Sequence, residues 1–154
     1  MSIIEKALEL IKGLEFVELA TADKSGKPNS APKFFLKTNC KIVYLIDYSI
    51  GKTAENLKEN SKVSLSFLDF DSLLGYKLNG KAQVIKTGKI YDECLKEVEE
   101  KEAKLSAKRI IKEVDEGKSV YKAYEVQLSK HVLVYKIELE EGSEISPGGK
   151  IERE

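Results

Sequence analysis

Residues 41–56, KIVYLIDYSIGKTAEN, join a run of β-branched and aromatic residues directly to the start of a helix. The part from 42 to 46 is continuously apolar, which predicts a strand covered on both faces. The part from 52 to 59 contains strong helix formers after a Ser/Gly start, which predicts a short helix. A buried strand that runs straight into a helix start places free backbone N–H groups where they can hold an anion.

The start of this predicted helix has the residue types that a phosphate site requires. Gly51 lets the backbone approach, Lys52 adds positive charge and Thr53 adds a hydroxyl beside the positive end of the helix dipole. The segment is equally consistent with an ordinary helix in which Ser49 or Thr53 is only a cap and Lys52 is solvated. A P-loop is excluded, because Ile46 stands where that loop requires its first glycine.

The flanking sequence predicts a β-barrel with inserted helices. Short apolar runs alternate with turn residues, as in antiparallel strands, and parallel βαβ repeats are not indicated. Gly75 and Gly80 fall inside one run, which indicates a bulge or a close backbone approach. Strands are expected at 16–21, 30–36, 41–46, 63–70, 73–85, 120–128 and 131–139, and helices at 3–12, 52–59 and 90–114, the last as one helix or two with a break.

The domain organisation follows from the chain length of 154 residues, which matches one ordinary domain. We expect that domain to span 1–141, with a long amphipathic helical insertion at about 90–116 that covers the barrel. The Gly/Ser/Pro-containing tail, 142–154, is expected to be loose unless a partner subunit holds it.

Composition excludes several classes of function. The 26 basic and 26 acidic residues are intermixed, so the positive field that binds nucleic acid is missing. No apolar run is long enough to span a bilayer and the N-terminus does not have the pattern of a signal peptide, so we expect a cytoplasmic protein without membrane contact. Cys40 and Cys94 stand far apart, which indicates neither a zinc site nor a disulfide framework.

Single polar residues provide no catalytic centre. His131 is the sole histidine and falls in a predicted strand, so we assign it no role and expect neither Ser-His-Asp hydrolysis nor a metal site. The carboxylates of the long helix, which include Glu97 and Glu102, are expected to form a solvated face with neighbouring lysines.

A second candidate segment is PNSAPKFF, residues 28–35. Pro32 in mid-strand removes a ladder hydrogen bond, which indicates an edge or an interrupted strand. A flat heterocycle with amide edges, such as an isoalloxazine, could bond the free backbone groups while Phe34 or Tyr48 packs beside it. From this segment alone, a plain edge strand is the better interpretation.

Together these segments resemble the pyridoxamine 5'-phosphate oxidase-related family of FMN-binding split barrels. The resemblance covers about residues 16–85. It depends on the order of the pieces, which are ATA at 20–22, GKPN at 26–29 with Ala31-Pro32, IVYLID at 42–47 with Lys52-Thr53 and Asn56-Leu57, VSL at 63–65 and NGKA at 79–82.

The resemblance implies a mainly β fold, a six- to seven-stranded antiparallel split β-barrel with flanking helices, and a homodimer with FMN at the subunit interface. The strand from 30 to 34 would lie along the flavin ring, the segment from 47 to 49 would border the ring and ribityl chain, and the pair at 52 and 53 would hold the phosphate. Two residues would approach from the partner subunit. The candidate cofactor-binding residues are Ser30, Ala31, Pro32, Lys33, Phe34, Asp47, Tyr48, Ser49, Gly51, Lys52, Thr53 and Asn56, with Tyr76 and Lys77 as the two from the partner.

One departure limits the function that the resemblance implies. True pyridoxamine phosphate oxidases carry an arginine-rich, histidine-bearing C-terminal motif, whereas this tail offers only Arg153. We therefore expect an FMN-dependent oxidoreductase or reductase with a small-molecule electron donor or acceptor, and we assign no catalytic side chain. The alternatives are a non-catalytic FMN-binding or electron-transfer protein, a reductase that binds deazaflavin F420, an unliganded dimeric interaction domain and, less favoured with one histidine, a haem protein.

Overall fold

The computed structural model describes residues 1–115, 132–148 and 151–154. In this part of the chain the predicted helices and strands occur in the predicted order, but one short strand near the C-terminus was not predicted and the strand before it is longer than predicted. The elements are α1 (Ile3–Ile11), β1 (Phe16–Ala22), β2 (Pro28–Asn39), β3 (Ile42–Asp47), α2 (Lys52–Glu59), β4 (Lys62–Leu68), β5 (Gly75–Ile85), α3 (Lys89–Asp115), β6 (Leu133–Ile145) and β7 (Ile151–Arg153).

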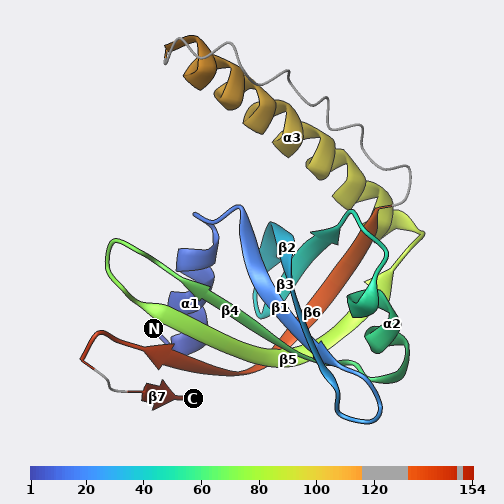
Figure 1. Cartoon of the computed structure of the whole chain (residues 1–154), viewed down its shortest axis with the longest axis vertical. Helices are drawn as coiled ribbons and strands as arrows, with labels where there is room; N and C mark the ends of the chain where they lie inside the picture. The colour runs from blue at the N-terminus through green and yellow to red at the C-terminus, as the bar shows by residue number, and fades with distance from the viewer. Residues whose placement is uncertain (116–131, 149–150) are drawn as a thin grey trace.

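Six antiparallel strands close a barrel, which confirms the predicted fold class. Their order is β3-β2-β1-β4-β5-β6, the barrel closes by pairing of β3 with β6, and β7 is added beside the end of β6. β2 pairs with β1 over Pro28 to Phe34 but with β3 only from Phe34 onward. The barrel is therefore split along one edge of 28–33, and Figure 1 shows α2 at this end of the barrel.

β3 is buried on both faces, as its apolar sequence predicts. Val43 and Leu45 point into the barrel core, whereas Tyr44 and Ile46 belong to a second apolar cluster. Cys94 and Val98 of α3 lie in that second cluster and are almost fully buried. The first half of α3 therefore covers the outer face of β3.

α3 is one unbroken helix, the first of the two predicted possibilities. Figure 1 shows that its second half extends away from the barrel. The predicted strand at 120–128 and His131 lie outside the described residues.

The C-terminal segment differs from the expectation of a loose tail. β6 continues to Ile145, and β7 pairs with it. The backbones of Gly142 and Glu154 exchange two hydrogen bonds, and the Glu154 carboxylate accepts one from the backbone N–H of Ile3 at the start of α1. The pairing of β6 with β7 is local, whereas the bond from Ile3 to Glu154 joins residues 151 positions apart.

The predicted bulge lies between Asn79 and Gly80, where the register of β5 against β6 shifts. A Cβ at position 80 would lie 2.1 Å from the carbonyl oxygen of Glu138, so this glycine is required by the close approach of the two strands.

Candidate functional site

The start of α2 presents unsatisfied backbone donors at the split of the barrel. Gly51 is the N-cap residue, and no side chain caps the helix. The first intrahelical hydrogen bond is donated by Glu55 to Gly51, which leaves the three preceding N–H groups without an intrahelical acceptor. A Cβ at position 51 would meet no atom within 4 Å, so the approach to these donors is open. The arrangement suits an anion.

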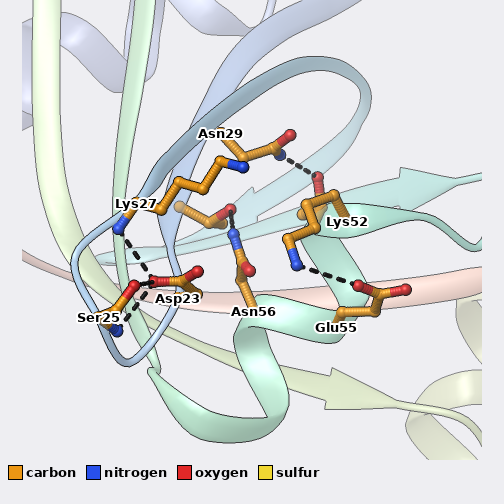
Figure 2. Close-up of polar contacts among 9 residues, drawn as sticks. Asp23, Ser25, Lys27, Asn29, Lys52, Glu55 and Asn56 are labelled. Carbon is orange, nitrogen blue, oxygen red and sulfur yellow. Dashed lines mark hydrogen bonds and ion pairs between the residues drawn. The ribbon is translucent and has the colours of Figure 1, made fainter.

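Two polar side chains connect α2 to the free edge of β2. Asn29 Nδ2 donates to Thr53 Oγ1 at 3.3 Å, and Thr53 is buried. Lys52 is half exposed and its Nζ lies 3.2 Å from Glu55. Figure 2 shows the Lys27 side chain extending toward Asn29, the residue that bonds Thr53.

The β1–β2 turn that carries Lys27 is held by Asp23. Its Oδ1 accepts hydrogen bonds from the backbone N–H groups of Ser25 and Lys27 and from the Ser25 hydroxyl, at 2.7 to 2.9 Å. The Ser25 hydroxyl bond, followed by the Lys27 backbone bond, lowers the pKa of this carboxyl. The turn stays in place because the ionised carboxylate organises it (Figure 2).

β2 alternates between the two faces of the sheet along its free edge. Ser30, Pro32 and Phe34 are exposed, whereas Lys33 points inward and is 6% exposed. Lys33 Nζ lies 2.9 Å from Asp47 Oδ2, and the Tyr135 hydroxyl donates to the same oxygen at 2.6 Å.

Asp47 connects this buried network to the loop before α2. Its Oδ1 accepts a hydrogen bond from the backbone N–H of Ser49 at 3.1 Å and a longer one from the Ser49 hydroxyl. Lys33 and Asp47, both predicted to contact a cofactor, are therefore paired below the surface. Their side chains hold the β3–α2 loop rather than project from it.

Phe34 and Tyr48 form an aromatic corner on the outer face. Their rings meet edge to face with centroids 5.0 Å apart. The Tyr48 hydroxyl donates to Glu102 of α3, and partial burial, followed by this bond, raises the pKa of that phenol. α3 is thereby fixed beside the segment predicted to border a flavin.

Of the remaining predicted residues, Asn56 lies in α2 itself, whereas Tyr76 and Lys77 lie on β5. Asn56 is buried, and its Nδ2 donates to Thr21 of β1 at 3.0 Å, while its Oδ1 has no partner among the described residues. Tyr76 is buried in the barrel core and donates to Glu144 at 3.0 Å, whereas Lys77 is exposed. Tyr76 bonds Glu144 of β6, and Tyr76 and Lys77 both lie on β5, so their predicted role at the start of α2 depends on a partner subunit.

The described residues contain no group of three or more His, Cys, Asp or Glu side chains placed to hold a metal ion. In the same residues no helix is long and apolar enough to cross a bilayer.

The sequence profile of pyridoxamine 5'-phosphate oxidase matches residues 3–142, nearly the whole chain. The chain belongs to the pyridoxamine 5'-phosphate oxidase family. This match confirms the resemblance drawn from the ordered segments between 16 and 85, and it extends that resemblance through α3 and most of β6.

A curated relative of this family member is an uncharacterized protein of Methanocaldococcus jannaschii. The two are 34% identical over 92 residues, which span 56% of this chain and 61% of that protein. The match thus covers under two thirds of the relative's length.

Three solved structures share the fold with this pyridoxamine 5'-phosphate oxidase family member. A Clostridium acetobutylicum protein related to general stress protein 26 has a TM-score of 0.65 at 18% identity, over 99% of this chain and 93% of that one. A Nostoc punctiforme protein, described as FMN binding, has a TM-score of 0.58 at 10% identity, over 98% of this chain and 93% of that one. HutZ, the haem storage protein of Vibrio cholerae, has a TM-score of 0.60 at 16% identity, over 91% of this chain and 92% of that one.

Lys27 and Asn29 were missed as site residues by sequence reasoning. Both fall in the GKPN segment that supports the resemblance, yet neither stands at the predicted helix start. The Asn29 side chain bonds Thr53 of α2, and Lys27 extends toward Asn29 (Figure 2), an arrangement that only the folded chain shows. The signal available in the sequence for these two site residues was that a lysine and an asparagine stand close to a turn glycine.

Proposed function

We propose that the protein binds FMN at the split of the barrel and works as a flavin-dependent redox protein. The observation that carries the proposal is the uncapped, open start of α2, with Lys52 as its first residue. A dianionic phosphate is stabilised by backbone N–H donors and nearby ammonium groups.

The residues fit FMN at both ends of that molecule. The N–H groups of Lys52 and Thr53 would hold the phosphate, with Lys27 adding charge. The backbone from Ser30 to Pro32 has an edge without a strand partner in the described chain, which suits the polar edge of an isoalloxazine ring. When bound, the flavin supplies the electron or hydride chemistry, while the chain binds, orients and shields it.

A homodimer belongs to the same proposal. Lys77 would then approach the flavin from the partner subunit, and a small molecule would serve as electron donor or acceptor. Support comes from the family assignment and from Lys77's exposed position on β5.

Two other ligands remain the rivals to test. F420 would use the same helix start through its phosphodiester. Haem is named for one structural neighbour, HutZ, but the only histidine of this chain, His131, lies outside the described residues.

The experiment is an FMN titration of the ligand-free protein and of two lysine variants, followed by flavin fluorescence. We expect Lys52→Ala to raise the Kd for FMN by about tenfold or more, because a hydrogen bond to a charged group is lost. Lys58→Ala, in the last turn of the same helix, should change the Kd little. Equal effects of the two substitutions would contradict the phosphate assignment.

A further inference from the structure

A cavity lies between α3 and the outer face of β2 and β3. Its volume is about 290 Å³. Its walls are mostly apolar and aromatic, and they come from β2, β3, α3, the segment before β1 and the loop after β3. The lining side chains include Phe34, Phe35, Tyr48, Lys101 and Leu105.

Lys101 supplies the cavity with a cationic hydrogen-bond donor. Its Nζ donates to the carbonyl of Phe35 and lies 4.9 Å from the centre of the Phe35 ring. No carboxylate is ion-paired with Lys101 in the described part of the chain, and burial lowers the pKa of its ammonium group. One bond to a carbonyl leaves two N–H groups of the ammonium for another acceptor.

The other polar groups make an anionic ligand a poor fit. The carboxylates of Glu15 and Glu102 also line the cavity, so its two acidic groups outnumber the single lysine. A neutral molecule with an acceptor oxygen can bond Lys101 without repulsion from these carboxylates. The aromatic walls favour a planar shape, and the volume, at the lower end for small-molecule sites, favours one or two fused rings.

The cavity's position connects it to the proposed cofactor. Phe34 ends the strand segment proposed to lie along the flavin ring, and Tyr48 lies in the segment proposed to border it. A molecule in the cavity would therefore lie next to the ring, on the side covered by α3.

We propose that this cavity, lined by Phe34, Tyr48 and Lys101, binds the small-molecule partner of the flavin, a neutral planar carbonyl compound of the quinone class. Its placement beside the ring rests on the proposed function, whereas binding itself rests on the cavity alone.

The test measures binding of 2,3-dimethyl-1,4-naphthoquinone by ligand-observed NMR, with and without saturating FMN. Both reactive ring positions of this probe are blocked, so the exposed Cys40 thiol cannot add to it. Leu105→Trp fills the cavity, and Ala107→Trp is its control at an exposed position of the same helix. Lys101→Met removes the donor, and Lys104→Met is its exposed control.

The expected result is saturable binding at one site per chain, weakened about fivefold or more by Leu105→Trp and by Lys101→Met and unchanged by either control. FMN should not displace the probe. Thermal unfolding of each variant identifies any that fail to fold. If one variant fails, the other variant and its matched control provide the test of binding in the cavity.

Three results separate this inference from the proposed function. Binding unaffected by Leu105→Trp, or no binding to protein that takes up FMN, overturns the inference alone. Displacement of the probe by FMN also overturns it, because the ring itself would then occupy the cavity. Probe binding with the expected variant effects in a protein that does not take up FMN supports the cavity and overturns the proposed function.

Discussion

At the scale of single residues, the Asp47 carboxylate is the point on which the candidate site depends. It is 2% exposed and bonds Lys33, Tyr135 and Ser49 together. A buried charge is tolerated when its partners satisfy it, and it becomes costly when one partner is removed. The network fixes the β3–α2 loop and, through it, the open helix start.

Lys33→Met should therefore destabilise the protein strongly. We expect the free energy of unfolding to fall by about 3–5 kcal/mol, because Asp47 would remain buried without its cation. Urea denaturation measures this change in the free energy of unfolding. Adding Asp47→Asn to Lys33→Met should recover part of the loss.

The matched control is Lys81→Met. Lys81 pairs with Glu140 at 2.9 Å, but both side chains are more than half exposed, so its removal should cost far less stability than the removal of Lys33. Similar losses for the two lysines would contradict the stabilising role of the buried pair.

Gly80 tests the close approach of β5 and β6. Gly80→Ala should destabilise by about 1–3 kcal/mol or more, because its Cβ would lie 2.1 Å from a backbone oxygen that cannot rotate away. Gly75→Ala, on the same strand, meets its nearest atom at 3.4 Å and should cost less. The difference in denaturation midpoint is the measurement, and no difference would argue against the bulge geometry.

At the scale of elements, Tyr76 and Glu144 join β5 to β6 across the sheet. Burial, followed by the bond to Glu144, raises the pKa of Tyr76 from 10.0 to about 12. A folded-state pKa above the unfolded one gives stability that is present below pH 10 and is lost as pH rises through 12.

Unfolding free energy should thus fall more steeply between pH 10 and 12 in the natural chain than in Tyr76→Phe. Denaturation curves at fixed pH values across this window measure the difference, and the lysine titrations common to both proteins cancel. Parallel pH profiles would contradict the raised pKa.

Some helices and strands could be predicted from local sequence and others could not. The short helix at 52–59 was predicted with the bounds of α2, because its start and stop signals lie within it. The strand pairing at the C-terminus was missed, because the Gly/Ser/Pro-containing segment between β6 and β7 has the composition of a loose tail, and the bond from Ile3 to Glu154 is not visible in local sequence.

The candidate site was predictable to the same degree. Gly51, Lys52 and Thr53 share a helix start and could be grouped from sequence. The bond between Tyr135 and Asp47 joins residues 88 positions apart, so no local pattern revealed it. The alternation of β2 was visible, but the inward direction of Lys33 required the register with β1 and β3.

At the scale of the whole molecule, exposed apolar side chains collect at the end of the barrel opposite α2. Leu68, Ile145 and Ile151 follow one another across neighbouring strands in register with Gly75, and Phe70 lies in the adjoining turn. Apolar surface of this kind marks a contact with another protein.

Light scattering should give twice the chain mass of 17.3 kDa. Leu68→Lys with Ile145→Lys should shift the mass toward one chain, because two charges would be buried in the interface. Ile111→Lys, exposed on α3, is the control that should stay dimeric. A single-chain mass for the natural protein would contradict the proposed homodimer.

The central claim is that this family member holds FMN at the split of its barrel. The most direct measurement is an absorption spectrum of the purified protein, with the mass of any ligand released on denaturation. We expect a flavin spectrum and the mass of FMN, either as purified or after FMN is added. A different bound cofactor, or protein that stays colourless after FMN is added, would contradict it.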